Sequence, residues 1–363
     1  MFWTIHMEGS PCTLNTPAVA VGNSIFSFGQ ACCDRSSQNM VVRMFNTTNY
    51  RWSFIETKAE EGERIPDERY GHTAVAYMSK VYVWGGSTQD ENYFFRKLCC
   101  FDTTTNTWSF PEVSGSIPRG RVNHFACLVG NLMYIIGGFE QFRPNICKEI
   151  YALDLESMTW DIVKTREKFP KINMKCCFAV MGNRIYFFTG KLHWNEITYL
   201  DTVTCKWSTT FATGQVLSLR RWAQTFVFGR HIYLFGGRDE IYYLDYNDIQ
   251  RYTPETNEWK AVKPLGLAPV PRYRHSCVRV GARVFVFGGV TRYNKFSVED
   301  TQAIIYTNNI ECCMDVNVLD LCPSLRTLCF EAIYRNNIDV SVLPDILQSE
   351  FNTVTRKFCL FNC

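Results

Sequence analysis

The sequence predicts an all-β protein, a six-bladed β-propeller that is closed by its N-terminal strand and followed by a short α-helical C-terminal tail. Three observations support this fold class. An octapeptide that ends in glycine recurs along the chain, a tryptophan follows it in a nearly constant register, and the intervening stretches alternate like two strands joined by a polar turn. A period of about 50 residues marks a repeat architecture, so we expect the repeats to form one ring.

The octapeptide is a run of β-branched and aromatic residues closed by glycine. Such a run predicts a buried strand, and glycines at its end allow positive φ and a close approach of two backbones. Its six copies are "NSIFSFGQ" from 23, "SKVYVWGG" from 79, "NLMYIIGG" from 131, "NRIYFFTG" from 183, "RHIYLFGG" from 230 and "ARVFVFGG" from 282. The glycines assigned to this role are Gly85, Gly86, Gly137, Gly138, Gly236, Gly237, Gly288 and Gly289.

A tryptophan marks the outer strand of each repeat. It lies 29 residues after the octapeptide start in four repeats, from 23 to 52, 79 to 108, 131 to 160 and 230 to 259, and 24 residues after it in the repeat that starts at 183. One indole buries about 200 Å² and can fill the wedge between neighbouring blades. The tryptophans given this role are Trp52, Trp108, Trp160, Trp207 and Trp259.

The last repeat has no tryptophan of its own, and the N-terminus supplies one. After "ARVFVFGG" the segment "DVNVLDL" at 315–321 predicts a third strand, but no fourth strand follows it. The N-terminal "FWTIHMEGSP" matches the stretches around other blade tryptophans, such as "TWSFPEVSGSIP". We therefore expect Trp3 to complete the sixth blade and to remove the open sheet edges.

The chain divides into a propeller at 1–321 and a helical tail at 322–363. Ser324 is a suitable N-cap for a short helix, and a second helix is expected to begin within 341–344. Apolar residues at helical spacing form the face of the first helix, namely Leu325, Leu328, Cys329, Ala332 and Ile333. Those of the second helix are Leu343, Ile346, Leu347 and Phe351.

Bulk composition narrows the class of protein. At 363 residues, with 46% apolar and 15% aromatic residues, the chain can build a sizeable core. Its 38 basic and 35 acidic residues give a formal charge of +3, so the chain lacks the strong excess of basic residues typical of a dedicated nucleic-acid binder. We find no run of about 18 apolar residues and no N-terminal signal, so we expect no membrane contact and a cytoplasmic location, with a nuclear one left open.

Neither a metal centre nor a catalytic site is expected. The 17 cysteines include adjacent pairs such as Cys176-Cys177, which a strand would point to opposite faces, and we expect free buried thiols. C-x-x-C pairs with a matching second pair are absent. The iron-type pattern E-x-x-x-D-x-x-x-H is approached only at Glu63 and Asp67, where Gly71 takes the last place. The sequence therefore predicts no cofactor and no enzymatic activity.

The tail carries a more specific pattern. The segment "SLRTLCFEAI" at 324–333 has the Leu-x-x-x-Cys-x-x-x-Ile spacing of an elongin BC box, and "LPDIL" at 343–347 has the Leu-Pro-x-x-Leu spacing of a cullin-2 box. Together the two look like a VHL-type box. With the six-bladed kelch-type ring, "SGSIPRGRVNHFACLVGNLMYIIGGFEQ" in its third blade and "LDLCPSLRTLC" at its end, the chain resembles a divergent member of the kelch domain-containing protein 3 family.

This resemblance implies a substrate-recognition subunit of a cullin-2 RING ubiquitin ligase, in which the propeller holds a substrate degron. Leu325, Cys329 and Ile333 would bind elongins B and C, and Leu343, Pro344 and Leu347 would bind cullin-2, which carries the RING subunit. The alternative is a non-enzymatic kelch interaction scaffold for cytoskeletal or chromatin proteins, whose tail only caps the propeller. Some relatives recognise protein C-termini, particularly those that end in glycine.

Loops before the first strand and after the glycines of each repeat meet on one rim of a propeller, where substrate-binding side chains are expected. A peptide C-terminus is a carboxylate, which arginine binds with bidentate, charge-assisted hydrogen bonds. The candidates are Lys191, Arg221, Arg238, Arg274 and Arg292. By contrast, the arginines and histidines of "RYGH", "RVNH" and "RYRH" recur in register and are interpreted as satisfied structural groups, namely Arg69, His72, Arg121, His124, Arg272 and His275.

The sequence departs from the relatives that read a terminal glycine. Those relatives have a longer fourth-blade loop with arginines, and their next blade opens with serine and histidine. This chain has "TGKLHWNEITYL" in the loop and "RRWAQ" at the start of the next blade. Lysine attracts a carboxylate as a point charge but lacks the planar fork of arginine, so the preferred substrate end stays open.

Overall fold

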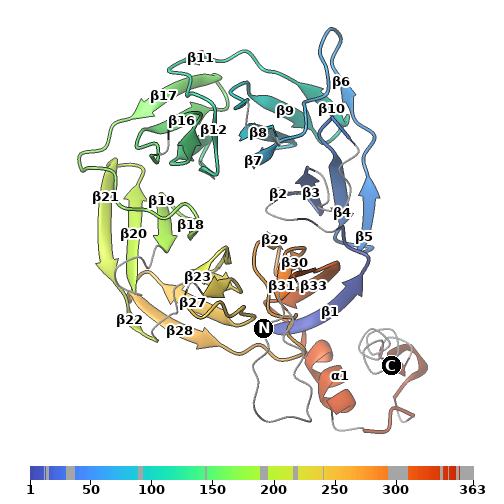
Figure 1. Cartoon of the computed structure of the whole chain (residues 1–363). Helices are drawn as coiled ribbons and strands as arrows, with labels where there is room; N and C mark the ends of the chain where they lie inside the picture. Colours follow the sequence, from blue (N-terminus) through green and yellow to red (C-terminus); the bar gives the residue numbers. More distant parts are fainter. Residues whose placement is uncertain are drawn as a thin grey trace.

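The described residues of the computed structural model form a closed ring of six blades, with a helix outside the ring (Figure 1). The structure describes residues 1–11, 13, 16–29, 37–88, 93–143, 145–188, 195–215, 220–239, 241–292, 310–335, 338–341, 343–348 and 351. The all-β class and the six-bladed architecture predicted from the sequence are confirmed. Over these residues, no helix is long and apolar enough to cross a membrane.

Each blade has a core of four antiparallel strands, and its first strand lies nearest the centre of the ring (Figure 1). Blade 1 contains β2 (Ala18–Val21), β3 (Ser24–Phe28), β4 (Val42–Asn46) and β5 (Arg51–Phe54). Blade 2 contains β7 (Tyr70–Tyr77), β8 (Lys80–Ser87), β9 (Cys99–Asp102) and β10 (Thr107–Ser109). Blade 3 contains β13 (Phe125–Val129), β14 (Leu132–Ile136), β16 (Ile150–Asp154) and β17 (Thr159–Val163).

The second half of the ring repeats this order. Blade 4 contains β18 (Cys177–Met181), β19 (Arg184–Phe188), β20 (Glu196–Asp201) and β21 (Lys206–Phe211). Blade 5 contains β24 (Gln224–Phe228), β25 (His231–Phe235), β27 (Ile249–Thr253) and β28 (Glu258–Val262). Blade 6 contains β29 (Ser276–Val280), β30 (Arg283–Phe287), β33 (Asp315–Asp320) and the N-terminal β1 (Phe2–Glu8).

Short strands connect the blades and form part of the rim. The linkers β6 (Lys58–Ala59), β11 (Ser114–Gly115) and β22 (Thr213–Gly214) pair in parallel with the tryptophan strands β10, β17 and β28 of the next blade. On the rim, β12 (Arg121–Val122) pairs with β15 (Phe139–Glu140) and β23 (Arg220–Arg221) with β26 (Arg238–Asp239). In blade 6, β31 (Val290–Arg292) pairs with β32 (Ile310–Cys312). The segment after a glycine pair is thus held against the rim.

The N-terminal strand closes the ring, as predicted. β1 pairs antiparallel with β33, and Trp3 lies opposite Leu319. The linker that leaves blade 5 contacts Trp3 as other linkers contact a blade tryptophan. A Cβ on Gly266 would lie 2.4 Å from the Trp3 carbonyl oxygen, and a Cβ on Gly115 would lie 2.3 Å from the Trp160 carbonyl oxygen. Because the same backbone contact recurs, Trp3 occupies the position that the other repeats fill from their own segment.

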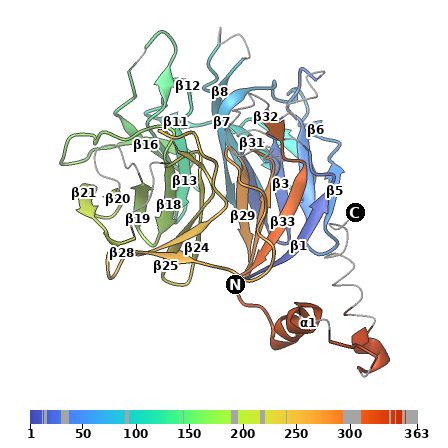
Figure 2. The same cartoon turned by 60° about the horizontal axis from the view of Figure 1, so that its bottom comes forward.

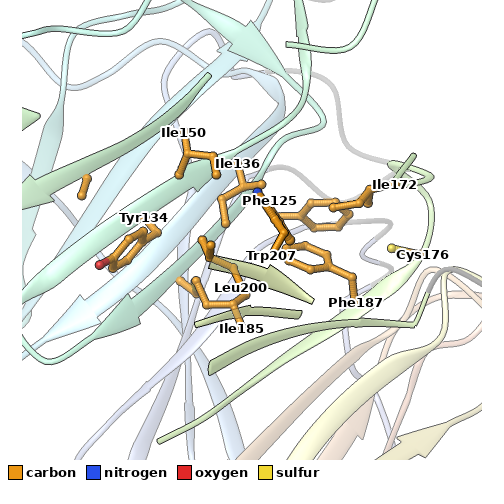
Figure 3. Close-up of a cluster of buried hydrophobic side chains, with 12 residues drawn as sticks. Phe125, Tyr134, Ile136, Ile150, Ile172, Cys176, Ile185, Phe187, Leu200 and Trp207 are labelled. Carbon is orange, nitrogen blue, oxygen red and sulfur yellow. The ribbon is translucent and has the colours of Figure 1, made fainter. Parts of the chain in front are cut away.

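A hydrophobic cluster lies in the wedge between each pair of neighbouring blades in the described chain, and each cluster includes one predicted tryptophan. Between blades 3 and 4, Trp207 packs with side chains of both sheets, among them Phe125 and Phe187 (Figure 3). The other wedges hold Trp52 (blades 6 and 1), Trp108 (1 and 2), Trp160 (2 and 3), Trp259 (4 and 5) and Trp3 (5 and 6). Cys176 and Cys177 belong to different clusters, which agrees with the prediction that adjacent cysteines face opposite sides.

The paired glycines allow neighbouring blades to approach closely. Gly85 has a φ of +72°, and a Cβ at this position would lie 2.6 Å from the ring of His124 in the next blade. A Cβ at Gly86 would lie 2.9 Å from the Cβ of His72 in its own blade. A side chain at Gly85 would therefore push two blades apart, and one at Gly86 would clash within its own blade. All eight predicted glycines have positive φ, as the sequence predicts.

The tail leaves the ring after β33. The helix α1 (Leu325–Arg335) lies outside the ring, beyond the edge at which β1 begins (Figure 2). It starts directly after the predicted cap, and the Leu328 amide donates to the Ser324 carbonyl at 3.1 Å. Residues 345–348 are helical as well. The buried rings of Phe330 and Phe351 meet edge to face with centroids 5.5 Å apart, so the two helical segments pack on each other.

Candidate functional site

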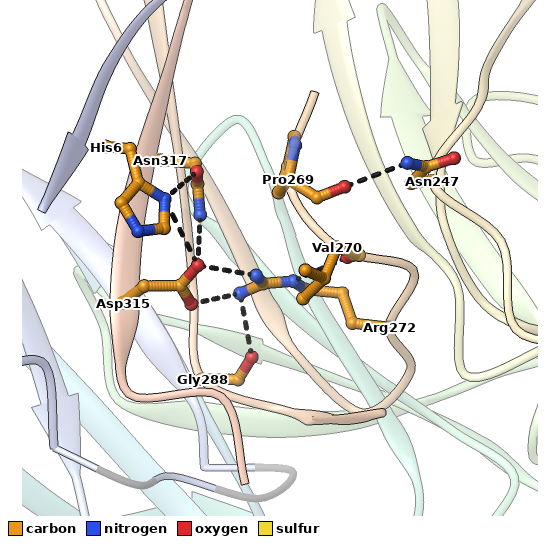
Figure 4. Close-up of polar contacts among 8 residues, drawn as sticks. All are labelled: His6, Asn247, Pro269, Val270, Arg272, Gly288, Asp315 and Asn317. Carbon is orange, nitrogen blue, oxygen red and sulfur yellow. Dashed lines mark hydrogen bonds and ion pairs between the residues drawn. The ribbon is translucent and has the colours of Figure 1, made fainter. Parts of the chain in front are cut away.

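A buried arginine fixes the rim loop of blade 6. The Arg272 side chain is fully buried, and its two terminal nitrogens donate to the two Asp315 oxygens at 2.7 Å each (Figure 4). Asn317 donates to the same carboxylate at 2.8 Å, and His6 Nδ1 of the N-terminal strand lies 3.4 Å from it. Burial acts to raise the pKa of Asp315, but the hydrogen bonds and charge of Arg272 outweigh it and hold that pKa below its usual value.

The same arrangement recurs in other blades. Arg121 donates to the Gly137 carbonyl at 3.1 Å, just as Arg272 donates to the Gly288 carbonyl at 3.4 Å. Arg220 donates to Asp248 Oδ2 at 2.8 Å, so it takes this role in blade 5. The arginines that the sequence assigned to the repeat, Arg69, Arg121 and Arg272, are all buried, which agrees with a structural role.

The repeat histidines are buried too, but they are not all satisfied. Ring nitrogens of His72 and His124 form hydrogen bonds of 3.2 and 2.7 Å to the preceding blade. His275 differs from the prediction: neither ring nitrogen has a hydrogen bond to a described residue, and the ring packs edge-on against Phe235 at 5.2 Å. Burial, followed by the charge of the arginine three residues earlier, lowers the pKa of all three rings to about 3. They are therefore neutral at physiological pH.

Residues at the start of the innermost strands, or two positions before them, form an inner rim in which one blade bonds to the next. The Asn123 amide donates to the Gly71 carbonyl at 2.9 Å, which joins blade 3 to blade 2. The Trp222 amide donates to the Lys175 carbonyl at 2.9 Å, and the Arg274 amide to the Trp222 carbonyl at 3.2 Å. These five residues therefore occupy equivalent positions. We call Lys175, Trp222 and Arg274 the inner-rim triad.

The inner-rim triad concentrates positive charge around an aromatic ring. The Arg274 guanidinium lies 4.5 Å and the Lys175 ammonium 5.1 Å from the centroid of the Trp222 ring. Partial burial, followed by the charges of Arg221 and Arg274, lowers the pKa of Lys175. Neither Lys175 nor Arg274 has an ion pair with another described residue. Such a surface attracts an anionic group and favours one with a flat or apolar part.

A third cation, Arg238, lies next to the inner-rim triad. Arg238 is buried, donates to the Tyr273 hydroxyl at 3.0 Å, and its Nε lies 3.8 Å from Asp245. Its second terminal nitrogen has no hydrogen bond within the part of the chain that the structure describes. Burial raises the pKa of Asp245, although the Arg292 amide donates to it at 2.9 Å. The Tyr273 ring in turn lies 5.7 Å from the Trp222 ring. Arg238 is thus connected to the triad through one tyrosine.

The structure brings together four of the five residues predicted for the rim. Arg221 lies opposite Arg238 in the β23–β26 ribbon, Arg274 belongs to the triad, and the backbone of Arg292 contacts Asp245. Lys191 lies outside the described residues. The sequence did not identify Lys175, although its place before the innermost strand of the fourth repeat is the signal that would have found it.

The box residues of the tail lie at the surface to different degrees. Leu325 is 77% exposed, Cys329 is exposed, and Ile333 is half-buried. In the second segment Pro344 is exposed, whereas Leu343 and Leu347 are half-buried. Leu325 and Cys329 therefore leave apolar surface exposed on one side of α1.

A closed ring of repeats with glycine pairs, wedge tryptophans and rim arginines defines a kelch-repeat β-propeller protein. The KLHDC2/KLHL20/DRC7 Kelch-repeats domain matches residues 15–237, 147–289 and 192–321. The chain is 32% identical over 374 residues to Kelch domain-containing protein 3 of Rattus norvegicus and of Homo sapiens, covering 98% of this chain and 96% of each relative. It is 28% identical over 257 residues to Kelch domain-containing protein 10 of Homo sapiens, covering 65% of this chain and 58% of that relative. The chain therefore belongs to the kelch domain-containing protein 3 family, as its motifs predict.

Proposed function

We propose that this protein is the substrate-recognition subunit of a cullin-2 RING ubiquitin ligase. In this proposal the propeller binds the substrate and the tail binds elongins B and C together with cullin-2. The protein acts as a non-catalytic adaptor in the cytoplasm or nucleus. The observation that carries the proposal is the exposed Leu325 and Cys329 side of α1, on a helix that lies outside a ring already closed by β1.

The chemistry of α1 fits a helix-in-groove contact. On its buried side, Phe330 packs against Phe351. This packing therefore does not involve the box residues Leu325 and Cys329. Leu325 and Cys329 lie four residues apart and share one face of the helix. Burial of an exposed leucine in an apolar groove contributes about 2 kcal/mol, and a small thiol fits beside it as a hydrophobe.

The rim is the proposed substrate site. Arginine and lysine side chains of blades 4 to 6 suit a carboxylate, and the free C-terminus of a protein supplies one. The inner-rim triad offers two cations without ion pairs in the described chain, and Arg238 offers one terminal nitrogen that has no hydrogen bond to a described residue. The second helical segment, with Leu343, Pro344 and Leu347, is proposed to contact cullin-2.

Affinity purification of the tagged full chain tests the proposed assembly. We expect wild-type protein to recover elongins B and C and cullin-2, and Leu325→Ala/Cys329→Ala to lose elongin binding by roughly 30-fold, since about 2 kcal/mol of burial is removed. Leu343→Ala/Leu347→Ala should lose cullin-2 and keep the elongins.

The matched control for these variants is Leu267→Ala, which changes a leucine of similar exposure, 71%, on the propeller. It should recover all partners at wild-type levels. Equal elongin recovery by the wild type and by the folded Leu325→Ala/Cys329→Ala variant would contradict the proposal and favour a scaffold whose tail only caps the ring.

A further inference from the structure

The rim carries more positive charge than one carboxylate neutralises. Lys175 and Arg274 lie on the same indole ring, neither has an ion pair in the described chain, and the charges of Arg274 and Arg221 act on Lys175. A ligand with a single negative charge would leave repulsion between these cations. A ligand with two adjacent negative charges would neutralise both.

An exposed apolar turn lies near the charges of Lys175 and Arg274. Four consecutive residues after β26 are exposed, and we call them the apolar finger: Ile241 (53% exposed), Tyr242 (63%), Tyr243 (62%) and Leu244 (48%). Asp239 holds the turn, because its Oδ1 accepts the amides of Ile241 and Tyr242 at 2.7 Å each and its own amide donates to the Leu244 carbonyl at 2.8 Å. The finger is therefore built by specific hydrogen bonds.

The finger and the triad belong to one continuous surface. The Arg238 guanidinium lies 5.4 Å from the Tyr243 ring and 5.0 Å from the Tyr273 ring, which lies 5.7 Å from the Trp222 ring. These contacts place the Tyr243 and Trp222 rings no more than about 16 Å apart, which an extended peptide covers in about five residues. One short peptide can reach both.

We propose that the rim of blades 4 to 6 selects substrates whose C-terminal residue is Asp or Glu and which carry a large apolar side chain within about five residues of that end. The side-chain carboxylate of the last residue lies beside Lys175, its α-carboxylate lies beside Arg274, and the apolar side chain packs on the finger. This inference deepens the proposed function and rests on its claim that the rim binds a free peptide C-terminus. Complementary charge then decides which terminus is accepted.

Fluorescence anisotropy with the full chain tests this inference. The probe is a labelled eight-residue peptide of Gly and Ser that has Phe four residues before a C-terminal Asp. Three matched peptides change one feature each: Asn replaces the terminal Asp, the α-carboxylate of the Asp peptide is amidated, or Ser replaces Phe. We expect each of the three to bind at least fivefold more weakly than the probe, with the Asp to Asn change and the amidation each giving about tenfold or more.

The outcomes separate the inference from the proposed function. If Asn and Asp ends bind equally while amidation still weakens binding, the acidic preference is wrong and carboxylate recognition stands. If amidation has no effect, carboxylate recognition itself fails. A phosphoserine peptide with an amidated end that binds as tightly as the probe would show that the cations of the rim bind a phosphate group instead of a C-terminal acidic residue. That result would overturn the inference.

Variants of the chain locate the effect. Lys175→Met should reduce the preference for Asp over Asn at least threefold, and Lys175→Arg should keep it, because only the charge is needed. The control Asn123→Gly changes the equivalent position in blade 3 and should leave every affinity within twofold. An unchanged Asp preference in Lys175→Met would contradict the assignment of the second carboxylate to this lysine.

Discussion

Blades 2 and 3 differ from blades 5 and 6 at the same point of the backbone. The inner-rim residues Gly71 and Asn123 have φ of 68° and 53°, and Trp222 and Arg274 have φ of 55° and 57°. Glycine and asparagine adopt this left-handed conformation readily, whereas a bulky side chain costs roughly 1–2 kcal/mol there. Blades 5 and 6 therefore accept a conformational cost that blades 2 and 3 avoid.

The repeat residues and the rim residues are constrained by different physical requirements. Glycine pairs, wedge tryptophans and buried arginines recur because each solves the same packing problem in every blade. The inner rim differs from blade to blade, and Trp222 and Arg274 adopt a strained backbone conformation that brings the indole ring and the guanidinium group within 4.5 Å. We infer that this half of the rim serves binding.

The largest expected effect is on stability, and it differs between two arginines that lie two residues apart in the sequence. Arg272→Met leaves the buried Asp315 without its partner and should lower the free energy of unfolding by about 3–5 kcal/mol. Arg274→Met, which breaks no ion pair in the described chain, should change it by less than about 0.5 kcal/mol. Urea unfolding followed by tryptophan fluorescence measures both. Similar losses for the two variants would remove the distinction between structural and rim arginines.

A smaller effect concerns the buried histidines that blades 2, 3 and 6 share. Their pKa is about 3 in the folded chain and near 6.5 when unfolded, so the unfolded chain takes up protons first as the pH falls. The stability that these neutral histidines contribute is fully present above about pH 6.5 and is lost progressively as the pH falls to about 3. Between pH 6.5 and 5 the protonation of each histidine in the unfolded chain should lower the free energy of unfolding by about 2 kcal/mol.

Urea midpoints at these two pH values test the histidine prediction. His124→Gln lacks one titrating ring and should lose about 2 kcal/mol less than the wild type over this interval, even though its stability at pH 7 is lower. The titratable groups of the outer surface contribute equally to both proteins. The same pH dependence in both would show that His124 is not held neutral.

Most of the fold could be predicted because its determinants are local and repeated. Each octapeptide specifies a buried strand, and the register of the tryptophans specifies the outer strand that fills the wedge. Even the closure by Trp3 followed from a missing fourth strand. The N-terminus of α1 was predicted from Ser324 for the same reason, because capping and apolar spacing are local properties.

The site was predicted only in part because it is assembled from different blades. Arg238 and Arg292 were identified as rim residues by their place after the glycines, but the burial of Arg238 depends on Tyr273, which comes from the next blade. Lys175 was missed because its neighbours Trp222 and Arg274 lie about 50 and 100 residues away in sequence, which is one and two periods of the repeat, and the sequence does not show that these positions are adjacent in the ring.

Photo-crosslinking shows where a substrate C-terminus binds, which we propose is the inner rim of blades 4 to 6. A peptide with a free C-terminal Asp and benzoylphenylalanine as the preceding residue is irradiated with the full chain, and the modified positions are mapped by mass spectrometry. We predict adducts within 220–224, 241–246 and 272–276, and their loss when excess unlabelled peptide competes. Competed adducts centred on Gly71 and Asn123 in blades 2 and 3 would contradict the account.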